Sequence, residues 1–469
     1  MIPTTGTPFT NLSLPTLATP TPEDSRNVQR ISSATATDSR TIGKFLTPTD
    51  LFSATVSGPD DHFCPPPWLY DAILAVFHSP VPTPRAPSVK FDLSDESLAW
   101  NSQVIRECGY DLENLFAANV GTTLSPGSEF RPPDQLSRLF SRHPNFNFFM
   151  STIRDGMGYE FETTLSEDER QTELAAMIQR GNHQSAVKHS THVAALLAKD
   201  VRHGFSLPCS PDLVTSIKQA MVQPCGVVEQ FALTETGDRK LKRRLTQDLS
   251  FSLVVPRAAV NQRIDMTKYP PMFYGHCFSR ILHFVSALRE RYPTTPIFIA
   301  KYDYSDAYRR MAHSPSAAAQ SIIIFQSIAY IALRLTFGGS ANPPGFCAFS
   351  EMVADLANEI RLCNEWDGQL RSPAQPQTPT ALRQPKSIPF QRARPCAVKI
   401  PTTVTGRTEC FIDDLINVFL GSASNILTEP HVVPLAIHLS SRPHANQQES
   451  VPLRQVIQPD KLVAEGTPA

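Results

Sequence analysis

Large apolar residues are sparse at the start of the chain and become regularly spaced further along it. Residues 1–60 are rich in Thr, Ser and Pro, a composition that buries too little apolar surface to offset the entropy lost on ordering. We therefore predict a disordered leader over 1–60. From 61 to 235 the clearest apolar patterns have helical spacing, which predicts a mainly helical N-terminal extension.

Two helices of this extension are marked by residues at their ends. Ser166 and Glu169 form a capping-box pattern that opens a helix, and Gly181 can close it. A second helix is predicted from about Ser190 to Gly204. Neither helix carries recognisable chemistry, so a structural role is preferred for this region.

The second half of the chain alternates strand-like and helix-like patterns. This order predicts an α+β layer in which helices cover one face of an antiparallel sheet. The predicted elements are a helix over 278–288, a strand over 296–303, apolar β-rich runs over 321–325 and 330–337, a helix from Pro343 to Ile360, and two short strands that flank residues 413 and 414.

Acidic residues stand where the apolar strands of this layer end. Asp303 closes the first strand, and Asp413 and Asp414 lie at the bend between the last two. An ionised carboxylate in a dry interior costs several kcal/mol unless a cation or hydrogen bonds compensate it, and a divalent metal is the simplest compensation. Asp303, Asp413 and Asp414 are therefore candidate ligands. Asp306 fits a helix cap or a loop contact at least as well as catalysis.

Two segments that contain these acids, and a third segment between them, resemble, in order, the motifs of reverse transcriptases from retroelements and retroviruses. Upstream, Lys240-Leu-Lys242-Arg-Arg244 with Asp248 and Asn261 is similar to the fingers segment of that family. The resemblance spans roughly 237–420. Its three motifs are Asp303-Tyr-Ser-Asp306-Ala307-Tyr308, Leu335-Thr-Phe-Gly338-Gly339-Ser-Ala-Asn-Pro343-Pro344-Gly-Phe346, and Phe411-Ile-Asp413-Asp414.

The resemblance implies the fingers and palm of a right-hand polymerase. It divides the chain into the leader (1–60), the helical extension (61–235), fingers (236–300), a palm (301–425) and a truncated C-terminal segment (426–469) in which a thumb is missing. A Pro-rich stretch at 370–407 with seven basic residues and no acid interrupts the palm. It is typical of a disordered, solvated insertion, and a nucleic-acid contact is the alternative.

The resemblance also implies a reaction and its metal ligands. Two Mg²⁺ ions, for which Mn²⁺ could substitute, would promote nucleotidyl transfer to a primer 3′ end. In this family the ligands and catalytic carboxylates would be Asp303, Asp413 and Asp414. Asp303 and Asp413 are the preferred ligands, because the second acid of the pair often supports the site more weakly in the family.

Further residues of the motifs would bind the incoming nucleotide. Tyr308 resembles the steric gate that rejects a 2′ hydroxyl, with Ala307 beside it. Lys242 and Arg244 would neutralise the triphosphate, although a solvated basic run or a nuclear-import patch is the plain alternative. Gly338 and Gly339 would allow the backbone to approach the nucleotide and template closely. The alternative is an ordinary Gly-Gly turn with no role in binding.

Composition limits the partners and the compartment. The net charge is −1 with a pI near 6.9, so binding of nucleic acid would have to depend on local basic patches. The nine Cys form no Cys-x-x-Cys pair, which argues against a zinc site and for reduced thiols. No uncharged stretch reaches membrane-spanning length and no secretory signal is visible. We expect an intracellular protein of the cytoplasm or nucleus.

The resulting hypothesis is an RNA-directed DNA polymerase of a retrotransposon, whose partners are a primer on an RNA or DNA template and dNTPs. An RNA-dependent RNA polymerase shares the palm carboxylates, but Tyr308 and the Ile-Asp-Asp bend disfavour it. A domesticated remnant that binds nucleic acid or a partner without polymerising is the non-enzymatic alternative.

Overall fold

The computed structural model describes residues 65–233, 239–272, 274–304, 306–372, 403–442, 457–459 and 463–464. This part of the chain is a mixture of α-helices and antiparallel sheets, which confirms the α+β class. The predicted leader (1–60) and most of the basic insertion (370–407) lie outside the described residues.

A five-stranded antiparallel sheet carries the predicted acidic segments. It contains β4 (Ile297–Tyr304), β7 (Gly406–Phe411), β8 (Asp414–Leu420) and β10 (Val463–Ala464) in the order β10-β4-β8-β7, and β9 (Ile457–Pro459) also pairs with β4. The predicted first strand and the predicted hairpin are both present. Because β8 runs antiparallel beside β4, the end of β4 lies against the start of β8.

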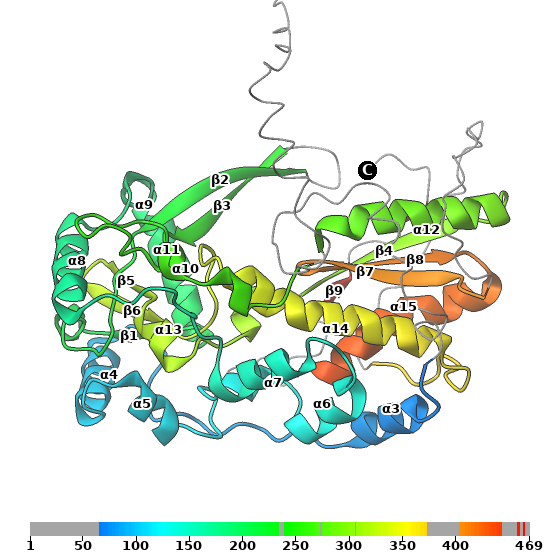
Figure 1. Cartoon of the computed structure of the whole chain (residues 1–469), viewed down its shortest axis with the longest axis horizontal. Helices are drawn as coiled ribbons and strands as arrows, with labels where there is room; N and C mark the ends of the chain where they lie inside the picture. Colours follow the sequence, from blue (N-terminus) through cyan, green and yellow to red (C-terminus); the bar gives the residue numbers. More distant parts are fainter. Residues whose placement is uncertain are drawn as a thin grey trace, which may run out of the picture. The chain divides into compact units, whose positions relative to one another are not determined.

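Helices cover both faces of this sheet (Figure 1). α14 (Asn342–Leu362) and α15 (Ala423–Ser440) pack on one face, whereas α12 (Cys277–Arg291) packs on the other. The prediction of helices on a single face is therefore wrong. The reason is that β4 is apolar on both sides: Phe298 belongs to the core with α14 and α15, and Ile297 to the core with α12.

A separate three-stranded sheet contains the two β-rich runs. It has the order β1-β6-β5, with β1 Ser206–Cys209, β5 Ile322–Phe325 and β6 Ile328–Ala332. Both runs do form strands, but they pair with each other, and β6 also pairs with β1, instead of joining the sheet of β4, which corrects their predicted place in the palm. The second strand also ends at Ala332, earlier than predicted.

A two-stranded ribbon is formed by β2 (Cys225–Leu233) and β3 (Arg239–Gln247) (Figure 1). The two strands pair from Cys225 opposite Gln247 to Leu233 opposite Arg239. The predicted boundary between extension and fingers, at 235 and 236, falls between these paired strands. The two predicted segments therefore share one structural element.

The N-terminal region is mainly helical, as predicted. The capping box of Ser166 and Glu169 is present, and Gly181 ends that helix with a positive φ of 73°. The second predicted helix runs from Ser190 to Arg202. The helices are α3 (Leu69–His78), α4 (Asp95–Glu107), α5 (Leu112–Ala118), α6 (Pro133–Phe140), α7 (Phe146–Asp155), α8 (Glu167–Arg180), α9 (Gln184–Lys188) and α10 (Ser190–Arg202), and two short ones follow, α11 (Val260–Arg263) and α13 (Pro315–Ala319).

Part of this region shares a core with the five-stranded sheet. Phe130 contacts Phe349 of α14 edge to face and Phe149 stacks on it, with ring centroids 5.0 and 5.2 Å away. α15 also packs along α14, so the compact unit continues past the predicted palm boundary at 425. Residues on both sides of the predicted palm thus complete its core.

A buried ionic group joins distant parts of the chain. The Glu129 carboxylate lies 3.5 Å from Nη1 of Arg310 and 3.9 Å from Nη2 of Arg334, and all three side chains are buried. Arg310 also donates to the carbonyl of Arg442 at 3.0 Å, and Arg334 to the hydroxyl of Ser128 at 2.7 Å. Burying two guanidinium groups is tolerable because a carboxylate and these acceptors surround them.

We predict that Glu129→Gln destabilises the protein strongly. The substitution keeps the shape but removes the negative charge, which leaves two buried cations without it, and breaking such a pair costs roughly 3–5 kcal/mol. The measurement is the free energy of unfolding in denaturant. Glu229→Gln, in an exposed pair with Arg243, is the matched control and should change the free energy of unfolding far less. Equal effects of the two substitutions would contradict the argument.

His313 is fully buried beside Tyr159, with ring centroids 5.5 Å apart. Burial, aided by the charge of Arg309, lowers the pKa of His313 from 6.5 to about 3. Between these values the unfolded chain holds a proton at this residue and the folded chain does not. The free energy of unfolding therefore falls as the pH falls through this window.

We expect the free energy of unfolding of His313→Leu to depend less on pH than that of the parent protein. The slope of the unfolding free energy between pH 6.5 and about 4 should drop by up to about 1.4 kcal/mol per pH unit. Denaturant titrations at several pH values measure it. The exposed His78→Leu is the control and should leave the slope unchanged. An unaltered slope in His313→Leu would show that this ring is protonated in the folded protein.

Candidate functional site

Two predicted carboxylates face each other across neighbouring strands. Asp303 of β4 is directly opposite Asp414 of β8 in the antiparallel register. Side chains so paired have Cβ atoms about 4.5–5.5 Å apart and point to the same face of the sheet. Lys301, two residues before Asp303, forms an ion pair with Asp414 at 2.9 Å. The two negative charges are therefore close together with one cation beside them.

Asp413 lies next to this pair, in the turn between β7 and β8. Ile412 of the same turn has a φ of 60°, a conformation that a β-branched residue rarely adopts and that costs of order 1–3 kcal/mol. Burial raises the pKa of Asp413, and the charge of Asp414 adds to that rise, while Lys301 and Arg244 oppose it. A strained turn thus holds a partly desolvated carboxyl group beside a second one.

The donor set of Asp303, Asp413 and Asp414 suits a hard cation in its chemistry. Carboxylate oxygens are the ligands that Mg²⁺ prefers, and a divalent cation would relieve the repulsion between Asp413 and Asp414. As they stand, no three His, Cys, Asp or Glu side chains of the described residues come close enough together to hold a metal ion. The carboxylates are thus gathered at one end of the sheet without forming a closed metal site.

Tyr308 follows β4 in a short 3-10 helix, η6 (Ala307–Arg310). Its ring packs against Phe337 and Phe346, with centroids 5.2 and 5.7 Å away. Burial raises the pKa of Tyr308, with smaller contributions from Cys347, Asp413 and Tyr274. Tyr308 is therefore held within electrostatic reach of Asp413. Ala307 is buried at the start of the same turn.

Asp306 occupies the N-cap position of η6 but makes no capping hydrogen bond there. Its side chain instead pairs with Lys199 of α10 at 3.4 Å. The structure therefore shows an ion pair with helix α10 at Asp306 and no helix cap. Arg309 ties the same turn to α10, because its Nη2 donates to Asp200 at 2.5 Å.

The β2–β3 ribbon brings one basic residue to this region. The Arg244 guanidinium lies 5.8 Å from the centre of the Phe337 ring and lowers the pKa of Asp413. Lys242 and Lys240 are exposed on the same face of the ribbon, at two-residue steps of about 7 Å. The row of cations therefore starts beside the carboxylates and runs along the strand away from Arg244.

The glycine pair is required by contacts within the protein. Gly338 has a φ of 131°, and a Cβ there would lie 1.8 Å from the carbonyl oxygen of Gln247. A Cβ on Gly339 would meet the Asn342 amide at 2.6 Å. Asn261 braces the loop, since its amide donates to the Gly338 carbonyl at 2.7 Å and accepts from the Ser340 backbone at 2.8 Å. Close approach to the end of β3 is thus the structural reason for Gly338.

Sequence reasoning missed an aromatic cover over the carboxylate turn. Tyr274 of η5 (Tyr274–His276) and Phe278 of α12 both contact Phe411, each with ring centroids 5.4 Å from it. Phe278 is nevertheless 58% exposed. No signal in the sequence could have placed these rings, because they depend on α12 packing on the second face of the sheet.

A scan of the chain against models of known protein families finds no match, and a search of curated proteins finds no similar sequence. Among the described helices, none has the length and apolar character needed to cross a membrane. The function therefore has to be argued from the carboxylates, the ribbon and the Tyr308 turn.

Proposed function

We propose that this chain is an RNA-directed DNA polymerase that adds dNTPs to a primer paired with an RNA or DNA template. The observation that carries the proposal is the pairing of Asp303 with Asp414 across β4 and β8, with Asp413 in the adjacent strained turn. Carboxylates gathered at one end of a sheet suit nucleotidyl transfer, in which negative charge has to be neutralised at both the attacking and the leaving oxygen.

Asp303, Asp413 and Asp414 would hold the Mg²⁺ ions. When bound, these ions activate the primer hydroxyl and neutralise the departing pyrophosphate. The chain itself positions the carboxylates. The β-sheet register keeps Asp303 opposite Asp414, and the Ile412 turn keeps Asp413 partly desolvated. Lys301 balances part of the charge of Asp414.

The cation row of the ribbon supports triphosphate binding. Arg244 is the cation nearest to the carboxylates, and Lys242 lies one two-residue step further along the same face. Guanidinium and ammonium groups bind phosphate oxygens through charge-assisted hydrogen bonds. Arg244 would therefore bind the phosphates closest to the reaction, and Lys242 those further away.

Tyr308 is proposed as the gate against ribonucleotides. Its contacts with Phe337 and Phe346 keep the ring from moving freely, which a steric filter requires. Gly338 and Gly339 would contribute indirectly, since they allow the loop that carries Phe337 to sit against the end of β3.

Tyr274 and Phe278 lie over the Phe411 end of the hairpin, on the face of the sheet that carries Asp303 and Asp414. A primer–template duplex that reaches the carboxylates from this face has to displace these rings. We infer that the segment around η5 shifts when nucleic acid binds.

We predict that the chain extends a DNA primer on an RNA template with Mg²⁺, and that Asp303→Asn or Asp413→Asn abolishes extension. Each substitution removes a charged oxygen ligand, and the loss should be at least about a thousandfold, as expected when electrostatic stabilisation of the transition state is removed. Single-nucleotide incorporation under pre-steady-state conditions is the measurement.

Stability provides the control for these variants. Burial and Asp414 both raise the pKa of Asp413, so the neutral Asp413→Asn should unfold at the same or a higher temperature than the parent. Asp71→Asn on the exposed side of α3 controls for substitution as such. Full activity in either site variant would contradict the assignment of these residues as metal ligands. A parent chain that extends no primer with Mg²⁺ or Mn²⁺ would contradict the proposed activity.

Tyr308→Val should admit ribonucleotides, because a smaller side chain leaves room for the 2′ hydroxyl. We expect the preference for dNTP over rNTP to fall by at least about tenfold, or roughly 1.4 kcal/mol. The ratio of kcat/KM for the two nucleotides measures it. Tyr308→Phe keeps the ring and should keep the preference. If Tyr308→Val retains the parent preference, Tyr308 is only a core aromatic residue.

A further inference from the structure

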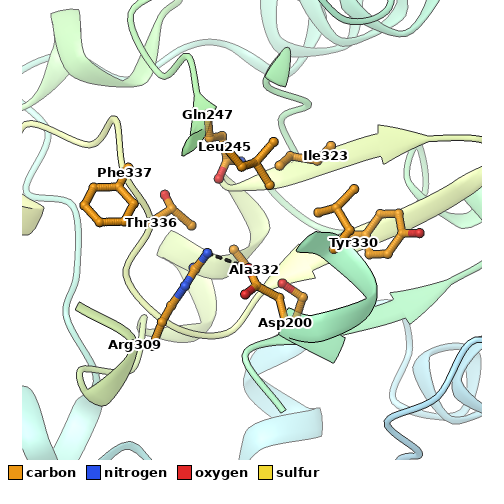
Figure 2. A pocket seen from close by; sticks show the side chains of 11 residues that line it. Asp200, Leu245, Gln247, Arg309, Ile323, Tyr330, Ala332, Thr336 and Phe337 are labelled. Carbon is orange, nitrogen blue, oxygen red and sulfur yellow. Dashed lines mark hydrogen bonds and ion pairs between the residues drawn. The ribbon is translucent and has the colours of Figure 1, made fainter. Parts of the chain in front are cut away.

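An ion pair between α10 and η6 lies beside the Tyr308 turn. Nη2 of Arg309 is 2.5 Å from a carboxylate oxygen of Asp200, and the two side chains are 15 and 16% exposed (Figure 2). The pocket that they line has a volume of about 20 Å³, which leaves room for about one water molecule. Water therefore screens this pair less than it screens a pair on the open surface.

Arg309 also holds a second segment of the chain. Its Nη1 donates to the carbonyl of Leu335 at 3.1 Å, and the Leu335 N–H donates to the carbonyl of Met311 at 3.0 Å. Leu335 is two residues before Phe337, whose ring contacts Tyr308. One guanidinium group thus links the backbone that carries Tyr308 to the backbone that carries Phe337.

The Tyr308 turn needs support from other elements. Asp306 has a φ of 51°, in the left-handed region that residues other than glycine adopt at a cost. The 3-10 helix that follows has only four residues, too few for a helix to be stable by itself. Contacts with other elements therefore have to fix the Tyr308 ring, and Asp200 makes such a contact through Arg309.

We propose that Asp200 is a positioning residue for the gate formed by Tyr308. Its carboxylate orients the Arg309 guanidinium, which fixes Tyr308 relative to Phe337 and so sets the space beside the sugar of the incoming nucleotide. This inference rests on the proposed function, in which Tyr308 rejects the 2′ hydroxyl. It gives α10 a part in sugar discrimination, in a region for which the sequence indicated only a structural role.

Lys199, the residue before Asp200, provides a matched comparison on the same helix. Its Nζ lies 3.4 Å from Asp306, and the two side chains are 46 and 30% exposed. An exposed pair of this kind contributes little. Lys199→Ala should therefore leave the gate unchanged, whereas Asp200→Ala should alter it.

Fluorine NMR of the full chain labelled with fluorotyrosine tests the position of the ring. The Tyr308 resonance is assigned by its loss in Tyr308→Phe. We expect Asp200→Ala to shift or broaden this resonance, because the ring gains freedom of movement. Asp200→Asn keeps an oxygen that accepts from Arg309, so its resonance should stay close to that of the parent.

The ratio of kcat/KM for dNTP and rNTP tests the consequence for the reaction. Asp200→Ala should lower the preference for dNTP at least about threefold, and kcat for dNTP should fall less than this ratio. A merely structural role would lower the two rates together. Arg309→Lys keeps the charge but lacks the fork that reaches both Asp200 and Leu335, so it should behave like Asp200→Ala and decides the case if that variant fails to fold.

The two measurements separate this inference from the proposed function. An unchanged Tyr308 resonance in Asp200→Ala, an unchanged preference in a chain that adds nucleotides, or an equal effect of Lys199→Ala would overturn the inference. A parent chain that adds no nucleotide would contradict the proposed function. The Tyr308 resonance alone would then decide whether Asp200 positions the ring.

Discussion

The arrangement of the candidate site depends on the buried carboxylate of Glu129. It lies between the guanidinium groups of Arg310 and Arg334, which come from η6 and from the stretch that follows β6. Arg310 ends the turn that begins directly after β4, so its anchor determines the direction in which the chain leaves Asp303. If this carboxylate were absent, two cations would be left in a dry interior, and the turn that carries Tyr308 would lose its support.

A second constraint connects the ribbon to that turn. Gly338 approaches the Gln247 carbonyl so closely that no side chain fits, and Asn261 holds the loop in place from the other side. This contact fixes Phe337 relative to β3, and the Phe337 ring in turn contacts Tyr308 and lies under Arg244. The geometry of the proposed nucleotide site therefore depends on the position of β3.

The packing of α12 on the second face of the sheet changes how the proposed site would work. An open sheet face would leave the carboxylates ready for a duplex, whereas here Tyr274 and Phe278 lie over Phe411. The aromatic cover shields apolar surface of the hairpin from water. Binding of nucleic acid would have to replace that shielding with contacts of its own.

The sequence by itself determined the local elements, because their signals act over a few residues. The capping box at Ser166, the strand that contains Asp303 and the hairpin at Asp413 are where their patterns predicted. The roles of the carboxylates, Tyr308 and the basic residues stay predictions. Only the tertiary structure decided which strands share a sheet, which face α12 covers, that Glu129 lies between Arg310 and Arg334, and that Gln247 lies against Gly338. The physical reason is that an apolar strand is equally compatible with several sheets and either face, and a single Glu or Gln acquires its role only from groups that lie far away in the sequence.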